Sequence, residues 1–294
     1  MSDDTALPFT GERFTPECVR EIWHEHWHRY AFAHRFAAGR RVLDAACGEG
    51  YGSALLASVA TEVVGVDVDA ASVAHARHRY GARPRLRYEQ VDATALPFAD
   101  RAFDLVVSFE TLEHLAAQEA LLQGFARVLA DDGLLLISSP DKRTYSELAG
   151  FRNEFHVREL YREELLALLR PHFAHVRLYG QKLLFQSALW SLDDGPPASC
   201  EAITADARAE QVVAGLGYAP LYFVAVCSRR PLPANLPALS LFGDAGESVY
   251  AHYNHEIRKN IEAGGRIAEL EAEIERLRSA PTPKREARWW RRKR

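Results

Sequence analysis

The residues near the N-terminus that most suggest chemistry are three histidines and a glutamate. His24, Glu25 and His28 form the pattern His-Glu-x-x-His, and His34 follows six residues later. On a helix, two histidines with this spacing lie one turn apart and can bind zinc, with the glutamate as the base. A third ligand must then return to the metal through a bend. The chain has Ala31 where such sites have glycine, and its single methionine is its first residue. The pattern therefore does not predict a zinc peptidase.

A second group of residues forms a glycine-rich turn after an apolar run. Gly48, Gly50 and Gly52 come directly after "VLDAAC" and before a segment with a helical pattern. Glycines allow the chain to turn tightly and to approach a ligand, and free amides at a helix start offer hydrogen bonds to it. A dinucleotide-binding fingerprint has its third glycine one position later, where this chain has Ser53. The turn predicts a nucleotide-type site that departs from that fingerprint.

Two aspartates stand at the ends of the next apolar runs. Asp67 follows the turn by about twenty residues, the position from which an acid accepts hydrogen bonds from the hydroxyls of a ribose. Asp92 ends the third run, where a carboxylate can accept a hydrogen bond from an adenine amino group. Together the two acids predict a site for an adenosine group.

These residues must be positioned by strands and helices that alternate along the chain. Continuous runs rich in Val, Ile and Leu are typical of parallel strands that are buried on both faces. Strands that alternate with helices predict an open sheet with helices on both faces. The predicted strands are 41–47, 62–67, 85–92, 102–109, 133–140, 175–180 and 221–228, and the predicted helices are 51–60, 70–80, 115–130 and 158–170.

Residues 41–140 resemble the core of class I S-adenosylmethionine-dependent methyltransferases. The resemblance rests on "VLDAACGEGYGS", "GVD", "VDA" and "FDLVVSFETLEHL", which stand in the family's order and spacing. It implies a Rossmann-like α/β fold with a seven-stranded sheet, and S-adenosyl-L-methionine as the cofactor. One departure is Ala46, where the family commonly has the first glycine of the turn.

The resemblance also implies how the cofactor is held. In the family, the glycine turn holds the methionine part, the acid after the second strand holds the ribose, and the residues after the third strand hold the adenine. Asp44 supports the turn and the amino group. The predicted cofactor-binding residues are Tyr30, Asp44, Gly48, Gly50, Tyr51, Gly52, Asp67, Val68, Asp92, Ala93 and Phe109.

The N-terminal segment 1–40 is predicted to form a helical lid. Its apolar residues recur at helical spacing, so one stripe can pack on the core. "TGERFTPE" and "EHWHRYAFAHRF" resemble the start of methyltransferases from bacterial polysaccharide and O-antigen gene clusters. That resemblance implies O-methylation of a sugar hydroxyl in a surface glycan or its precursor. Two alternatives stay open: a small-molecule acceptor such as a quinone, lipid or antibiotic sugar, and a scaffold without catalysis.

A sugar hydroxyl that attacks a methyl group must lose its proton near the transition state, so a base is expected. His114 follows the fourth predicted strand and His156 follows the fifth. Histidine titrates near neutral pH, which suits this role, although each residue could instead serve packing or capping. Glu110 and Glu113 are alternative bases. No cluster of metal ligands is evident in the sequence, and no metal is predicted.

The predicted methyltransferase domain spans 41–231, with an inserted loop and helix at 187–217. A proline-rich linker, 232–255, and a short coiled coil, 256–280, follow it. Ile and Leu at a and d positions of the coil favour a parallel homodimer, although a lone surface helix is the alternative.

The charge distribution sets the C-terminal end apart. The net charge of the chain is −4, but residues 284–294 carry +6, so the rest carries −10. The segment 281–294, with Trp289 and Trp290, is predicted to contact the inner face of the cytoplasmic membrane peripherally. The four cysteines show no CxxC pair, and no signal peptide or membrane-spanning run is seen, which predicts a cytoplasmic protein. Nothing in the core predicts nucleic-acid binding.

Overall fold

A computed structural model describes residues 15, 21–189, 191–192, 200–205 and 212–279. The chain divides into two compact units, Met1–Gly243 and Asp244–Arg294.

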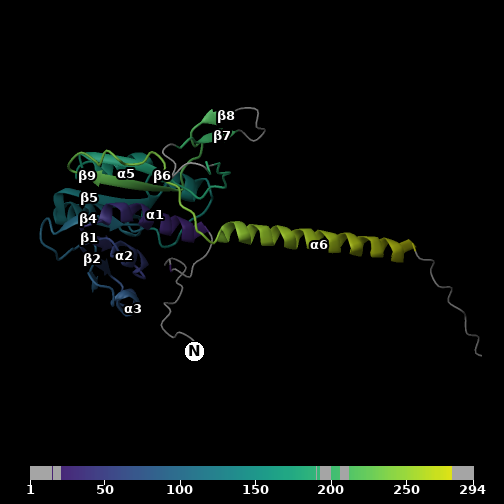
Figure 1. Ribbon diagram of the computed structural model, residues 1–294, viewed down its shortest axis with the longest axis horizontal. Helices are drawn as coiled ribbons and strands as arrows, with labels where there is room; N and C mark the ends of the chain where they lie inside the picture. Colours follow the sequence, from purple (N-terminus) through teal and green to yellow (C-terminus); the bar gives the residue numbers. More distant parts are fainter. Residues whose placement is uncertain (1–14, 16–20, 190, 193–199, 206–211, 280–294) are drawn as a thin grey trace, which may run out of the picture. The chain divides into compact units, whose positions relative to one another are not determined.

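The first unit contains a seven-stranded sheet in the order β3-β2-β1-β4-β5-β9-β6 (Figure 1). Strands β1 to β5 run parallel to one another, whereas β9 is antiparallel to both β5 and β6. The strand order reverses between β1 and β4, and ligands of open α/β sheets bind at the carboxyl edge beside such a switch point. The strands are β1 (Arg41–Ala45), β2 (Glu62–Asp67), β3 (Leu86–Gln90), β4 (Phe103–Ser108), β5 (Leu129–Pro140), β6 (His175–Gln181) and β9 (Tyr222–Ser228).

Helices cover the sheet on both faces, because successive strand residues point to opposite sides. Val42 of β1 belongs to a core cluster with residues of α1, α2 and α3, and its neighbour Leu43 belongs to a cluster with α4 and α5. Both side chains are fully buried. The helices are α1 (Glu21–Ala37), α2 (Tyr51–Leu56), α3 (Ala70–Tyr80), α4 (Gln118–Val128) and α5 (Arg162–Leu169), with a 3-10 turn η1 (Leu112–His114) and a π turn η2 (Arg143–Glu147).

Two regions of the first unit depart clearly from the sequence prediction. The strand expected at 133–140 begins at Leu129, which pairs with Phe103, and the register shifts before Leu134 pairs with Leu105. The polar residues at this irregularity hide the start of the strand from a search for apolar runs. In the inserted segment 187–217, a helix was expected. Its described residues instead form the antiparallel pair β7 (Ile203–Ala205) and β8 (Val212–Ala214).

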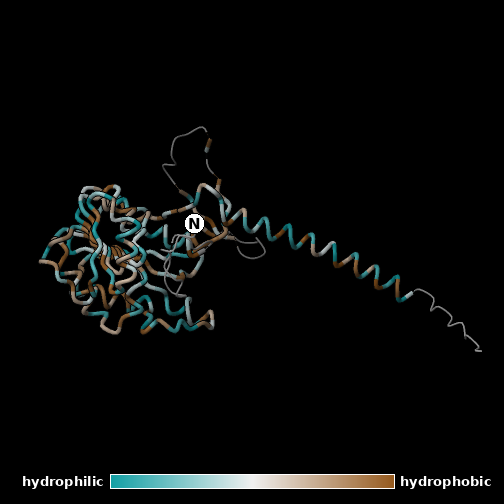
Figure 2. The backbone as a smooth tube through the Cα atoms, turned by 90° about the horizontal axis from the view of Figure 1, so that it is seen from below, coloured by the Kyte–Doolittle hydropathy of each residue, from teal (hydrophilic) through white to brown (hydrophobic). Residues whose placement is uncertain are grey.

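The second unit contains the helix α6 (Ser248–Ser279), which begins inside the segment predicted as a linker. The Asp244 carboxylate accepts a hydrogen bond from the Ser248 backbone amide, at 3.0 Å from Oδ2, and so caps the helix start. Hydrophilic and hydrophobic residues alternate along α6 (Figure 2). The segment 281–294, for which membrane contact was predicted, lies outside the described residues. Among the described helices, none combines the length and apolar character needed to cross a membrane.

Candidate functional site

The glycine turn between β1 and α2 adopts backbone angles that favour glycine. Gly48 has φ 55° and Gly50 has φ 93°. A Cβ at Gly48 would meet nothing within 4 Å, so open space adjoins the turn there. A Cβ at Gly52 would lie 2.1 Å from the Tyr30 ring, because α1 packs directly on the turn. Ala46, the departure noted in the sequence of the turn, also has a positive φ of 59°.

Asp67 ties the end of β2 to this turn. Its Oδ2 accepts a hydrogen bond from the Gly48 amide at 2.9 Å, and its Oδ1 accepts one from the Asp69 amide at 2.9 Å. A carboxylate oxygen has two lone pairs, so both oxygens keep capacity for the hydroxyls of a ligand. Asp92 lies exposed after β3 and accepts hydrogen bonds from the Thr94 amide and hydroxyl. The next residue after Asp67, Val68, is also exposed.

A buried acid and three aromatic rings meet beside the turn. Asp44 is fully buried and accepts hydrogen bonds from Tyr30 Oη at 3.0 Å and Ser53 Oγ at 2.6 Å. Burial raises the pKa of Asp44 to about 6, and the two hydrogen bonds oppose that rise. The Tyr30 ring packs edge-on against Tyr51 and Phe109, each at 5.1 Å between centroids. Thus α1 contributes directly to the predicted cofactor site.

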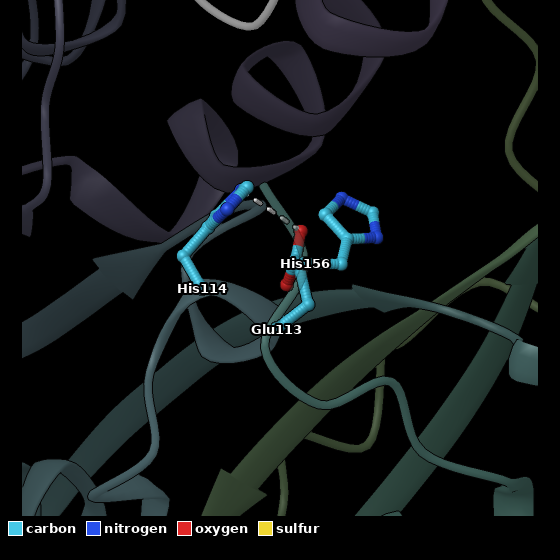
Figure 3. A group of neighbouring side chains, drawn as sticks. All are labelled: Glu113, His114 and His156. Atoms are coloured by element: carbon cyan, nitrogen blue, oxygen red, sulfur yellow. Dashed lines mark ion pairs between the residues drawn. The ribbon is translucent and has the colours of Figure 1, made fainter. Parts of the chain in front are cut away.

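The structure brings Glu113, His114 and His156 together from two distant parts of the chain (Figure 3). The His114 and His156 rings lie 5.0 Å apart in an edge-to-face contact. Nε2 of His114 is 3.8 Å from Oε1 of Glu113. The backbone holds this arrangement, because the amides of Val157 and Arg158 both donate to the Glu113 carbonyl oxygen. Both histidines predicted as bases are therefore in one group with Glu113.

Arg29 of α1 is a buried cation in the same region. Its Nη1 donates to Gln181 Oε1 at 2.9 Å and lies 3.7 Å from Glu110 Oε1. Its guanidinium stacks over the Tyr222 ring at 5.0 Å, whereas Nε and Nη2 have no hydrogen-bond partner among the described residues. Since its partners come from the segment after β4 and from β6 and β9, sequence spacing gave no signal for these contacts.

Glu49 is a residue that the sequence did not single out. It is buried in the glycine turn, and its carboxylate bonds to three residues of α3: His75 and Arg79 at 2.9 and 2.8 Å, and the Tyr80 hydroxyl at 3.0 Å. These contacts fasten the turn to α3. A glutamate between two glycines offered no sequence signal for this structural role.

The histidines of the His-Glu-x-x-His pattern have separate partners. His28 Nε2 is hydrogen-bonded to Ser240 Oγ at 2.9 Å, and its ring stacks on Phe242. His34 Nε2 is hydrogen-bonded to Ser58 Oγ at 3.0 Å. These contacts account for the pattern as part of α1 packing.

A cavity of about 570 Å³ lies beside α1 and β6 in the first unit. Its wall combines apolar side chains, such as Phe32, Leu178 and Phe223, with the basic residues Arg29 and Lys182. A space of this size and lining suits a small amphipathic molecule.

Comparison with known proteins gives a match over the sheet core. Residues 43–137 match a family model described as a methyltransferase domain. A probable S-adenosylmethionine-dependent methyltransferase of Mycolicibacterium smegmatis is 43% identical over 169 residues, which cover 56% of this chain and 64% of that protein. A demethylmenaquinone methyltransferase of Beutenbergia cavernae is 38% identical over 116 residues, 38% of this chain and 47% of that protein. The chain thus spans less than two thirds of the length of these relatives.

One solved structure supports the fold. The YcgJ protein of Bacillus subtilis superposes with a TM-score of 0.51 at 21% identity, covering 70% of this chain and 100% of that chain. Together with the strand order, this likeness confirms the predicted Rossmann-like seven-stranded sheet.

Proposed function

We propose that this chain, which carries a methyltransferase domain at residues 43–137, is an S-adenosylmethionine-dependent O-methyltransferase. The observation that carries the proposal is the glycine turn at the carboxyl end of β1, tied through the Gly48 amide to Asp67 at the end of β2. This pair lies beside the point where the strand order reverses, the position at which open α/β sheets bind ligands.

The residues at this edge fit the cofactor. Asp67 would accept hydrogen bonds from the ribose, and Asp92 with Ala93 would hold the adenine beside Phe109. Buried Asp44 would face the positively charged methionine end, and the open side of Gly48 leaves room for it. S-adenosylmethionine, when bound, supplies a methyl group on a sulfonium. The chain's own task is then to position an acceptor oxygen in line with that group.

We propose that His114 and His156 activate the acceptor. A hydroxyl must lose its proton as it attacks, and a positioned group that accepts or displaces this proton typically contributes about 10²–10⁴-fold to the rate. Both histidines follow strands whose carboxyl ends form the predicted site, and they lie together with Glu113. The loop that carries His156 is held on η1 by backbone hydrogen bonds to Glu113.

The acceptor that we propose is a sugar hydroxyl of a surface glycan or its precursor. The groups near Glu113 are polar. Glu110 accepts a hydrogen bond from Ser138 and lies close to Arg29, and Arg29 donates a hydrogen bond to Gln181. Such a lining suits a ligand with several hydroxyls. A small amphipathic acceptor such as a quinol is the second candidate. It is favoured by the partly apolar cavity beside α1 and by the relative from Beutenbergia cavernae, which is named for demethylmenaquinone.

Transfer of labelled methyl groups tests the proposal. The protein would be incubated with methyl-labelled S-adenosylmethionine and either lipid-linked glycans or quinols, and the products identified by mass spectrometry. Label in a glycan ether supports the proposed acceptor, and label in a quinol supports the second candidate. Cofactor binding without label in any acceptor would contradict the enzymatic proposal.

Binding of the cofactor is expected to weaken at acid pH because of Asp44. Burial raises the pKa of Asp44 to about 6, so below that pH the free protein holds a proton there, and this proton competes with the cofactor's positive charge. The affinity should fall about tenfold from pH 7 to pH 5 if the charged carboxylate is required. Calorimetry over this range tests the expectation. In an Asp44→Asn variant, the affinity for the cofactor should not change between pH 7 and pH 5. An equal fall in affinity in that variant would show that Asp44 does not cause the pH dependence.

We also propose that α6 joins two copies of the chain. Its apolar side chains are exposed in the single chain: Ile267, Leu270, Ile274 and Leu277. These residues occupy a and d positions, where Ile and Leu favour a parallel dimer. The full-length protein is expected to have twice the mass of one chain by light scattering, and Ile267→Ser with Ile274→Ser should give one chain. Glu262→Ser with Glu275→Ser is the matched control. A dimer that survives the first pair of changes would exclude this interface.

A further inference from the structure

The Glu113, His114 and His156 group has the composition of a metal site. Each residue offers a ligand atom, and the three atoms lie within 4.8 Å of one another. One carboxylate and two imidazoles are typical ligands of divalent first-row metals such as zinc, manganese and iron. Among the residues that the structure describes, this is the one group of three potential ligands that meets this criterion.

Both histidines are oriented as metal-binding histidines usually are. Nδ1 of His114 donates to the Phe155 carbonyl oxygen at 3.1 Å, and Nδ1 of His156 donates to Glu159 Oε1 at 2.7 Å. A metal-bound histidine almost always donates its other ring N–H to a backbone carbonyl or a carboxylate, which fixes the tautomer and the ring. In each ring this leaves Nε2 as the ligand atom. Nε2 of His156 accepts a hydrogen bond from Asn153 Nδ2 at 3.0 Å. This hydrogen bond would break when Nε2 binds a metal ion.

Glu113 supplies an independent observation. Its side chain is fully buried, and neither carboxyl oxygen has a hydrogen-bond partner among the described residues. A buried carboxyl group without a partner is costly, and such groups usually serve a function or bind an ion. The charged neighbours that act on it are Glu110 and Glu159, which favour a cation there, and Arg29, which opposes one.

We propose that Glu113, His114 and His156 bind a divalent transition-metal ion such as Zn²⁺ or Mn²⁺. Metal–ligand bonds of about 2.0–2.2 Å place tetrahedral ligands about 3.3 Å apart, so small rotations of these side chains would complete the site. Three protein ligands leave at least one coordination position open, as in catalytic rather than structural sites. The open position suits an acceptor oxygen.

The role of this ion rests on the proposed methyl transfer. A hydroxyl bound to the ion has a lowered pKa and loses its proton to water more readily. The acceptor oxygen then forms a bond to the methyl carbon while the carbon–sulfur bond breaks, and the electron pair of that bond stays on sulfur. The products are a methyl ether, a neutral thioether and a proton in solution. The ion also holds the acceptor oxygen in place.

Calorimetric titration of the full-length, tag-free protein after chelator treatment tests the site. Wild type is expected to bind one equivalent of Zn²⁺ or Mn²⁺. Glu113→Gln, which keeps the size of the side chain, and His156→Ala should weaken that binding about 100-fold or more, since even indirect partners of a ligand contribute about 10–100-fold. The matched control is His172→Ala, because His172 bonds to Glu119 at 2.8 Å outside any such group and should bind the ion as wild type does. Thermal unfolding shows that each variant is folded.

The outcomes separate this inference from the proposed function. Failure of wild type to bind either ion, or equal binding by Glu113→Gln and His156→Ala, would overturn the metal site. Full-rate methyl transfer by metal-free protein in excess chelator would overturn the proposed role of the ion in catalysis and would leave the methyltransferase proposal intact. Ion binding that depends on Glu113 and His156 without methylation of any acceptor would support the site and contradict the proposed function.

Discussion

Methyl transfer by a His114→Ala variant is expected to be about 10²–10⁴ times slower than by wild type at saturating cofactor, because the variant lacks a group that activates the acceptor. Nε2 of His114 lies 3.8 Å from Glu113 Oε1, and its ring contacts His156, so its removal disrupts the whole group. The loss applies whether the histidine accepts the proton itself or holds an ion that acidifies the hydroxyl.

Kinetic constants separate this role from a structural one. The loss should appear in kcat, and the affinity for S-adenosylmethionine should stay within about twofold, because an interaction made in the transition state affects the chemical step. His78→Ala is a suitable control, because His78 is exposed near the end of α3. If His114→Ala retained wild-type turnover, the Glu113–His114–His156 group would not be the activating site.

An Asp67→Ala variant is expected to lose about 10²–10⁴-fold in affinity for S-adenosylmethionine. Two hydrogen bonds from ribose hydroxyls to a carboxylate contribute roughly 1.5–3 kcal/mol each, and each 1.4 kcal/mol is a factor of ten. Part of the loss would come from the turn itself, because Asp67 Oδ2 also holds the Gly48 amide. Calorimetric titration measures the affinity directly.

Two further variants test whether the lost affinity comes from the Asp67 carboxylate. Asp67→Asn keeps one acceptor oxygen in the same place and should lose less affinity than the alanine variant. Asp100→Ala removes a surface ion pair with Arg127 and should bind as wild type does. Unchanged binding by Asp67→Ala would reject the ribose assignment and, with it, the proposed orientation of the cofactor.

Local sequence was sufficient for most of the sheet. The runs around Val42, Val63 and Leu105 are mostly apolar because parallel strands are buried on both faces, and this pattern needs no knowledge of distant contacts. The polar residues Asp131 and Asp132 broke that pattern, so the first part of β5 was missed. In the insertion, short segments with few buried residues gave no clear period, and a helix was expected where β7 and β8 pair as antiparallel strands.

By itself, the sequence determined the alternating fold and the glycine turn with Asp67, since these depend on neighbours along the chain and on backbone angles that glycine favours. Only the tertiary structure decided what surrounds that turn. The packing of Tyr30 on Gly52, the burial of Arg29 and the meeting of His114 with His156 all join residues far apart in sequence. Glu113 is the clearest case: its chemical importance lies in its burial without a partner, and burial is a property of the packed molecule.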